Sequence, residues 1–207
     1  MPSLSLASEK LQQTFGDTVV ASWVSNGVRI PFTNEQRPNL NLQNRPTTAP
    51  EKHFITNEIG RLEGLSYIRK VHIRPTSVSP IGAVKKKKNK LRLIHDLREV
   101  NKLCSTPAFR YEDITSLEAI VEPNDYLTSV DLQDGFHHIP VHPDDQQYLG
   151  FKWRDQYYVW NVLPFGLQCS PYFFTKTVRP LIGLLRATGI KIANYVDDFL
   201  IAGRLNA

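Results

Sequence analysis

Apolar side chains recur at helical spacing in two stretches near the start of the chain. The first thirty residues predict one or two short helices, the clearer one at residues 19–24, with Gly27 placed to end it. Residues 53–65 repeat the pattern, with Gly64 near its end. The intervening residues 34–50 are rich in Asn, Gln, Pro, Thr and Arg, which predicts an extended connector.

The next stretch of the sequence has the pattern of β-strands. Residues 79–84 and 91–98 are β-compatible runs on either side of the basic sequence KKKKNK, so they predict a hairpin with a strongly positive tip. Alternation along the second run places its three leucines and His95 on one face. The other face carries Arg92, Ile94, Asp96 and Arg98. That charged face is available for a ligand.

The second half predicts more strands and one long helix. Residues 125–131 form a short β-compatible run that ends on Asp131, and residues 148–163 have the pattern of an aromatic-rich hairpin. Ser170 and Pro171 are typical of a helix start, with Ser170 as N-cap, and Gly189 is placed to end that helix. Pro180 should kink the helix.

The last pattern is a hairpin with acidic residues at its turn. Residues 191–201 are apolar on both sides of the adjacent Asp197 and Asp198. Two ionised carboxylates side by side repel each other, and burial between apolar strands raises that cost. A divalent cation resolves the conflict, because Mg²⁺ prefers carboxylate oxygens. Asp131, also at a strand end, is the best third ligand.

Composition narrows the class of protein. The chain has 207 residues, 41% of them hydrophobic and 10% aromatic, which excludes a disordered tail and fits one sizeable core or two small subdomains sharing a cleft. Cys104 and Cys169 lie far apart without CxxC spacing, which excludes a zinc ribbon and a disulfide framework. The sequence shows no stretch long enough for a membrane span. We expect an intracellular protein, in the cytoplasm, the nucleus or both.

Charge divides the chain into two halves. Residues 1–110 hold 18 Lys and Arg against 8 Asp and Glu, whereas residues 111–207 hold 7 against 12. A basic half beside an acidic half is typical of a polyanion-binding surface next to a divalent-cation site, although chance asymmetry is the alternative. Two metal ions held by aspartates suit phosphoryl transfer, with Arg92 and the lysine tip able to hold a triphosphate. The lysines alone also fit a nuclear-localisation signal or a solvated run.

Four motifs in order carry a family resemblance. The segments SPIGAVKKKKNKLRLIHDLREVN, SVDLQDGFHHIPV, LPFGLQCSP and YVDD resemble the fingers and palm of reverse transcriptases encoded by retroelements. The phrases NGVRIPF, RYEDI and HPDDQQYLGFKW further resemble the tyrosine-recombinase class of retrotransposon, often called DIRS-like. The resemblance covers roughly residues 20–203.

The resemblance implies an α/β (α+β) fold, a right-hand polymerase with an antiparallel palm sheet and the thumb missing. It divides the chain into a leader and connector at residues 1–50 and basic fingers at residues 51–125. The fingers continue at residues 140–165, and residues 126–207 form the palm, which is truncated after the YVDD hairpin.

Site residues follow from the resemblance. Asp131 matches the first metal-binding aspartate, Asp197 the second, and Asp198 the acid beside it. Lys86, or Lys85 given a one-residue ambiguity in tip length, matches the lysine that meets the triphosphate. Arg92 matches the fingers arginine.

Two further positions concern the nucleotide. Phe165 and Gly166 match the place where the family contacts the incoming nucleotide, although retroviral enzymes often have Gln at the position of Phe165. Phe136 matches the residue beneath the nucleotide sugar. An apolar ring there would clash with a 2′-hydroxyl, so we expect deoxynucleotides to be preferred.

The implied activity is that of an RNA-directed DNA polymerase, a nucleotidyltransferase that adds dNTPs to a primer 3′ end with two Mg²⁺ ions, or Mn²⁺. Its implied partners are an RNA or DNA template with a primer, dNTPs, and the thumb and RNase H regions of a longer polyprotein, with no membrane. Two alternatives stay open: a catalytically silent nucleic-acid-binding remnant, and an RNA-dependent RNA polymerase.

Overall fold

The computed structural model describes residues 13, 18–33, 36–85, 90–112 and 118–204. The chain forms two compact units, each assembled from separate stretches of sequence. Unit 1 consists of Met1–Ser25, Pro107–Phe136 and Pro171–Ala207, and unit 2 consists of Asn26–Thr106 and His137–Ser170. Each unit has its own sheet and core.

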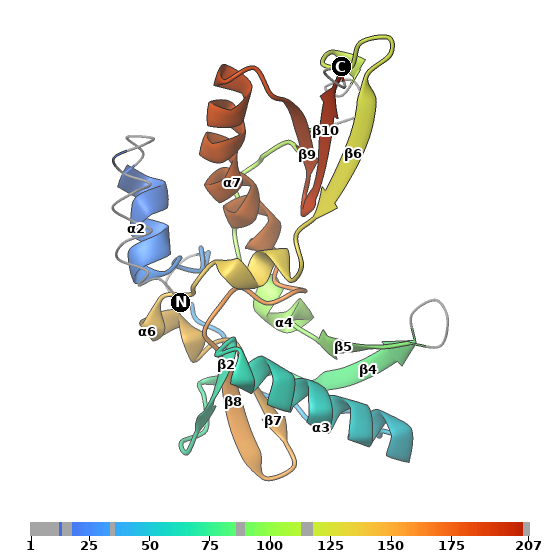
Figure 1. Ribbon diagram of the computed structural model, residues 1–207. Helices are drawn as coiled ribbons and strands as arrows, with labels where there is room; N and C mark the ends of the chain where they lie inside the picture. The colour runs from blue at the N-terminus through green and yellow to red at the C-terminus, as the bar shows by residue number, and fades with distance from the viewer. Residues whose placement is uncertain (1–12, 14–17, 34–35, 86–89, 113–117, 205–207) are drawn as a thin grey trace. The chain divides into compact units, whose positions relative to one another are not determined.

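Unit 1 is a three-stranded antiparallel sheet with a helix on one face (Figure 1). Its strands, in the order β6-β10-β9, are β6 (Tyr126–Asp131), β10 (Asp198–Gly203) and β9 (Lys191–Tyr195). Helix α7 (Ser170–Ala187) lies along the sheet, and its core contact joins Ile182 to Ile192 and Phe199. Helix α2 (Thr18–Asn26) adds Trp23, whose ring meets Phe173 of α7 edge-on at 5.0 Å.

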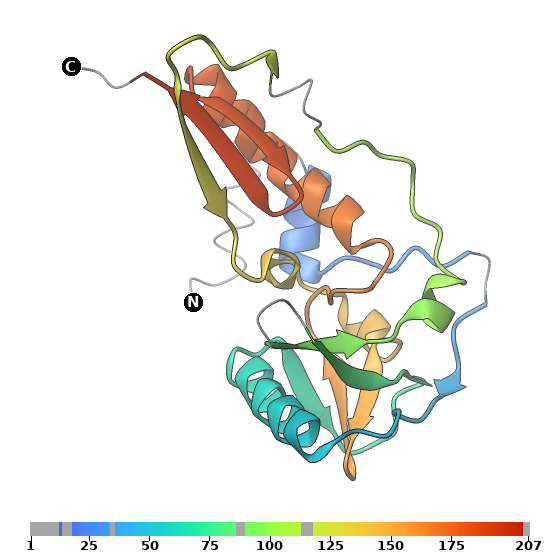
Figure 2. The same cartoon turned by 90° about the vertical axis from the view of Figure 1, so that its right-hand side faces the viewer.

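Unit 2 contains a five-stranded mixed sheet and a separate two-stranded hairpin. The five strands, in the order β1-β3-β7-β8-β2, are β1 (Leu40–Asn41), β3 (Ser77–Val78), β7 (Gly150–Trp153), β8 (Gln156–Trp160) and β2 (Ile68–Val71). The hairpin pairs β4 (Ile81–Lys85) with β5 (Leu91–His95), as Figure 2 shows. The unit also has α3 (Ala49–Gly64), α4 (Arg98–Asn101) and α6 (Pro143–Gln146), and the short 3₁₀ helix η2 (Gly135–His138) spans the unit boundary.

Within the described residues the predicted elements are confirmed, with local differences; most of the first seventeen residues and the lysine tip at residues 86–89 lie outside them. Helix α3 begins earlier than residue 53 because Thr48 and Glu51 form a capping box, in which the Thr48 amide N–H donates to the Glu51 carboxylate at 2.7 Å. Gly27 and Gly189 have φ of +83° and +88°, the conformation expected where α2 and α7 end. Ser170 is the first residue of α7 and not its N-cap, and its hydroxyl donates to the Pro164 carbonyl at 2.9 Å. Helix α7 continues through Pro180.

The unit boundaries differ from those expected at residues 50 and 125. Residues 26–50 belong to unit 2 because the connector joins its sheet: β1 pairs in parallel with β3, and Val28 bridges Val141. Residues 107–125 belong to unit 1 because their acidic side chains bind β9. Glu112 accepts a hydrogen bond from the Asn194 amide at 2.9 Å, and Asp125 pairs with Lys191 at 2.9 Å.

No helix within the described residues is long and apolar enough to cross a membrane.

Candidate active site

Three aspartates lie at one end of the unit 1 sheet. Asp131 ends β6 and Asp198 begins β10, and the antiparallel register places them directly opposite each other. Asp197 occupies the turn between β9 and β10, because Tyr195 pairs with Asp198. The Leu132 amide N–H donates to the Asp197 carbonyl oxygen at 3.0 Å, which ties the turn to the end of β6. The pairing therefore brings together the acids that the sequence singled out.

The turn holds a strained residue. Val196 has φ of +59°, a left-handed conformation that is unfavourable for a β-branched side chain. Such strain costs about 1–3 kcal/mol and persists only where surrounding contacts impose it. Here the Asn194 side-chain amide donates to the Val196 carbonyl at 3.2 Å. The tight turn fixes the backbone of the neighbouring acids.

The three carboxylates carry uncompensated charge. Asp131 and Asp198 are exposed and Asp197 is half-buried, and their side chains form no ion pair or hydrogen bond with the described residues. Like charges directly opposite on adjacent strands repel each other. Nothing else in the described fold offsets this repulsion, so the arrangement favours binding of a cation.

The donor set fits a hard divalent metal. Carboxylate oxygens are the ligands that Mg²⁺ takes, usually from one or two protein carboxylates plus water and phosphate. The side chains are not gathered into a closed cluster, since no three acidic, His or Cys residues in the described ranges converge on a metal-binding point. The site is thus an open set of oxygen donors at a sheet end.

Gly135 and Phe136 follow β6 in the sequence, and Gly135 packs against Asp197 at this acidic end. A Cβ added to Gly135 would lie 3.1 Å from the Asp197 Cβ and 3.4 Å from the Phe174 ring, so Gly135 leaves the space that both occupy. Phe136 is 7% exposed, and its ring meets Phe174 edge-on at 5.6 Å. Phe136 is therefore mostly packed into unit 1. The sequence did not reveal the role of Gly135, because only the fold brings it to Asp197.

The predicted triphosphate contacts lie on unit 2. Lys85 is exposed at the end of β4, and Lys86 lies outside the described residues. Arg92 is exposed on β5, and its guanidinium stands 5.2 Å from the centre of the Phe165 ring. A guanidinium at this distance over an aromatic face gains a cation–π attraction. The structure thus places Arg92 beside Phe165, two residues that the sequence selected separately.

A side-chain amide fixes the loop that carries Phe165 and Gly166. The Asn101 amide donates to the Gly166 carbonyl at 2.8 Å, and its carbonyl oxygen accepts from the Gln168 amide at 2.9 Å. Gly166 has φ of +95°, which favours glycine. The His137 ring also packs near this loop, with its centre 5.1 Å from the centre of the Phe165 ring. Asn101 was not predicted as a site residue, although it lies inside the first motif.

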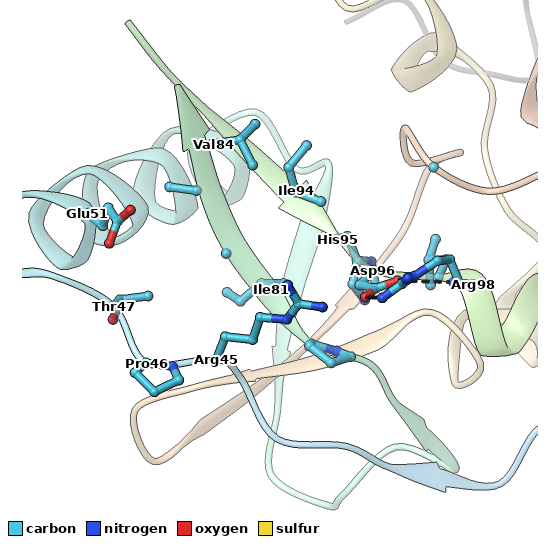
Figure 3. A pocket seen from close by; sticks show the side chains of 15 residues that line it. Arg45, Pro46, Thr47, Glu51, Ile81, Val84, Ile94, His95, Asp96 and Arg98 are labelled. Carbon is cyan, nitrogen blue, oxygen red and sulfur yellow. Dashed lines mark hydrogen bonds and ion pairs between the residues drawn. The ribbon is translucent and has the colours of Figure 1, made fainter. Parts of the chain in front are cut away.

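The charged face of β5 borders a cavity of about 530 Å³ (Figure 3). Ile94, Asp96 and Arg98 line it, but so do His95 and Leu97 of the other predicted face, because β5 ends at His95 and the strand alternation does not continue beyond it. Arg98 donates to Asp96 at 2.6 and 2.8 Å, and this hydrogen bonding holds the pKa of the Asp96 carboxyl below its usual range. Figure 3 also shows Arg45 in the cavity wall, supplied by the connector. Arg45 was not predicted, because its distance in sequence from the hairpin hides their proximity.

On the opposite face of β5, Leu91 and Leu93 are half-buried and His95 is buried. His95 accepts a hydrogen bond from the Trp160 indole N–H at 3.1 Å and packs edge-on against Phe151. Burial lowers the pKa of His95 to about 4, so the ring is neutral at pH 7. His95 is therefore a neutral, buried side chain that also lines the cavity beside Asp96.

The two cysteines are free and buried. Burial raises the pKa of the Cys104 thiol to about 11 and raises that of Cys169 further. Neither is a reactive thiolate at neutral pH.

Comparisons with known proteins agree with the family resemblance of the four sequence motifs. The family model described as "Reverse transcriptase (RNA-dependent DNA polymerase)" matches residues 84–206, more than half of the chain. The Gag-Pro-Pol polyprotein of Mason-Pfizer monkey virus is 38% identical over 136 residues, which are 61% of this chain and 8% of that protein. The Gag-Pro-Pol polyprotein of human T-cell leukemia virus 2 is 30% identical over 187 residues, 81% of this chain and 13% of that protein.

A solved structure shares the fold. The prototype foamy virus protease-reverse transcriptase, as its CSH mutant, superposes with a TM-score of 0.71 at 26% identity, covering 85% of this chain and 23% of that one. The chain thus spans under a quarter of that protein and a smaller share of the viral polyproteins.

Proposed function

Because the chain belongs to the reverse transcriptase family, we propose that it supplies the fingers and palm of an RNA-directed DNA polymerase that extends a primer with deoxynucleotides. Unit 2 would act as the fingers and unit 1 as the palm. The observation that carries the proposal is the placement of Asp131 opposite Asp198, with Asp197 in the adjoining turn.

The acidic end of unit 1 would hold the catalytic metal. Asp131, Asp197 and Asp198 offer only oxygen ligands, and their charges are unpaired among the described side chains. Divalent cations bound there would lower the pKa of the primer 3′-hydroxyl and stabilise the leaving pyrophosphate. The protein's own part is positional: the β6–β10 register and the Val196 turn hold the carboxylates in place before the substrate arrives.

Unit 2 would bind the triphosphate. Arg92 presents a guanidinium, whose planar donors match phosphate oxygens, and Phe165 supports it from one side. Lys85 or Lys86 would add a second positive charge. Asn101 would keep Phe165 and Gly166 in position for the nucleotide. This division of work agrees with the charge difference between the two halves of the sequence.

Phe136 would select the sugar. Its ring is fixed by Phe174 and is mostly buried, so it cannot turn aside easily to admit a 2′-hydroxyl. An apolar ring also offers that hydroxyl no hydrogen bond. This supports deoxynucleotides over ribonucleotides and argues against an RNA-synthesising polymerase.

Primer extension tests the proposal. The 207-residue chain is incubated with a primed RNA or DNA template, dNTPs and Mg²⁺, with Asp197→Asn as the matched control. Incorporation that is lost in Asp197→Asn, while the circular dichroism spectrum is unchanged, is the expected result. Incorporation retained by Asp197→Asn would overturn the assignment. Salt-sensitive template binding without extension by either protein would identify a silent nucleic-acid-binding remnant.

We further propose the DIRS-like subclass, on the basis of NGVRIPF, RYEDI and HPDDQQYLGFKW. A tyrosine-recombinase reading frame beside the coding sequence is the expected genomic context, and an integrase of the retroviral type there would contradict it. Action in the cytoplasm or nucleus follows from the proposed role and is checked by localising a tagged full-length protein.

A further inference from the structure

Unit 1 contains a second polar site, beside α7 and the edge strand β9. A cavity of about 280 Å³ is lined by residues of α7, of β9 and of the segment before β6. We call it the arginine pocket, and the lining residues that matter are Arg110, Glu112, Thr175, Arg179, Arg186 and Asn194. Three arginines against one glutamate leave an excess of positive charge. The chemistry of the lining therefore favours an anion.

One arginine forms the fixed wall of the pocket. Arg186 donates through Nε and Nη2 to the Ile192 carbonyl at 2.9 and 2.7 Å, and Nη2 also reaches both Glu112 oxygens at 2.7 and 2.8 Å. Glu112 in turn accepts from the Asn194 amide at 2.9 Å, at the outer edge of β9. The Glu112 carboxylate is thus already paired with Arg186, and Glu112 forms part of the pocket wall.

The other two arginines have charge to spare. Arg110 and Arg179 are exposed, and neither makes an ion pair or hydrogen bond with any residue in the described part of the chain. Arg179 follows Thr175 by four positions on α7, so the two side chains lie on one face of the helix. Both free guanidinium groups line the same cavity as the fixed Arg186.

A buried hydroxyl also lacks a partner in the pocket. Thr175 is 6% exposed, and its Oγ1 has no hydrogen-bond partner among the described residues. A buried polar atom without a partner is unfavourable, so a bound group that supplies a hydrogen bond there would be stabilised. Thr175 lines the pocket beside Arg179. A ligand oxygen at this point would satisfy the hydroxyl and meet the positive charge together.

We propose that the arginine pocket binds a phosphate group of a nucleic-acid strand. Guanidinium groups pair with phosphate through parallel hydrogen bonds, and threonine hydroxyls and arginines are the usual donors to the phosphate backbone. The inference rests on the proposed function only in taking the phosphate from nucleic acid. Such a contact would position a strand on unit 1 without reading its sequence, independently of the metal-binding aspartates.

Binding measurements on the full chain test the pocket. Fluorescence anisotropy with a labelled single-stranded oligonucleotide is recorded over a range of salt concentrations for the wild type, Arg110→Gln/Arg179→Gln and Thr175→Val. We expect the double variant to bind about tenfold more weakly at low salt, with the slope of log affinity against log salt reduced by about 0.7, the value for one phosphate contact on a single strand. Lys176→Gln/Arg204→Gln removes equal charge from unit 1 outside the pocket and is the matched control.

Thr175→Val separates a pocket contact from general charge. Removing an uncharged hydroxyl should weaken binding a fewfold without changing the salt slope, and should leave the melting temperature of the free chain equal or higher because an unpartnered buried group is lost. Equal losses in the charge control and the double variant, or wild-type binding by both pocket variants, would overturn the proposal.

Two further measurements identify the source of the phosphate and distinguish this proposal from the catalytic one. Inorganic phosphate that stabilises the wild type against heat, with oligonucleotide affinity unchanged in the pocket variants, would reject the strand as ligand. Asp197→Asn should bind the oligonucleotide normally while losing primer extension. Pocket-dependent binding without extension would therefore leave this proposal standing when the catalytic one fails.

Discussion

Asp131 and Asp198 are cross-strand neighbours, the last residue of β6 facing the first residue of β10. Two exposed carboxylates in this position repel each other and have no cationic partner among the described side chains. The fold therefore keeps a destabilising pair at the point where it would hold metal. Stability is given up locally to keep oxygen ligands available.

The first prediction concerns metal and stability. Mg²⁺ should raise the melting temperature of the wild type, because a bound cation offsets the repulsion and stabilises the state that binds it. Asp131→Asn/Asp197→Asn should melt at a higher temperature than the wild type without Mg²⁺ and should not respond to the ion. Asp155→Asn, a change at an exposed acid of unit 2, is the control. A wild-type shift reproduced in the double variant would contradict the metal site.

The second prediction concerns the turn. Val196→Asn should stabilise the chain by about 1 kcal/mol, because Asn tolerates the left-handed conformation that Val196 adopts at φ of +59°. Val196→Ala keeps an ordinary L-residue there and should gain less. Urea unfolding monitored by circular dichroism measures both. Equal stability for the two variants would show that the conformation of this residue is not a source of strain.

The third prediction is a pH dependence caused by His95. The pKa of His95 is about 4 in the fold and about 6.5 in the unfolded chain, so the unfolded state binds the proton first as the pH falls. Its contribution to stability is complete above pH 6.5 and is lost between pH 6.5 and about 4. The loss amounts to about 2 kcal/mol at pH 5.

Unfolding by urea at pH 7.5 and pH 5 measures the effect of His95. His95→Gln can still accept the hydrogen bond from Trp160 but cannot take up the proton, so it should lose less stability than the wild type between these two values. A loss as large in His95→Gln would assign the pH dependence to other groups.

The fourth prediction concerns Asn101. Asn101→Ala removes both hydrogen bonds that fix the loop around Gly166, at 2.8 and 2.9 Å, and should cost about 1–3 kcal/mol of stability. If the chain acts in the proposed polymerase, the KM for dNTP should rise more than kcat falls, because the loop would lose its position rather than its chemistry. Ser105→Ala, an exposed change just beyond α4, is the control. An unchanged KM would exclude a positioning role for Asn101.

The fifth prediction concerns the sugar. Phe136→Ala removes the ring that Phe174 holds in place, and should raise the ratio of ribonucleotide to deoxynucleotide incorporation at least tenfold. Incorporation is compared in single-nucleotide extension with each nucleotide type. Phe174→Leu, which loosens the support but keeps the ring, should give an intermediate ratio. A ratio unchanged in Phe136→Ala would assign Phe136 to the core alone.

Much of the local structure was predictable because it depends on nearby residues. The β4–β5 hairpin, its alternating faces and the aspartates at the β9–β10 turn follow from spacing and turn chemistry. The first residue of α3 was missed because the capping box of Thr48 and Glu51 overrides apolar spacing. Ser170 was misassigned as the N-cap because α7 begins one residue earlier than expected, at Ser170 itself.

The sequence by itself determined which residues bear the chemistry, since acids at strand ends, a basic tip and four ordered motifs are local properties of the chain. Only the tertiary structure decided which of them are neighbours. Strand register set Asp131 opposite Asp198, and a loop held by Asn101 carried Phe165 to Arg92. The arginine pocket likewise unites residues of α7, of β9 and of the segment before β6. Such contacts depend on packing between distant segments, which no local pattern records.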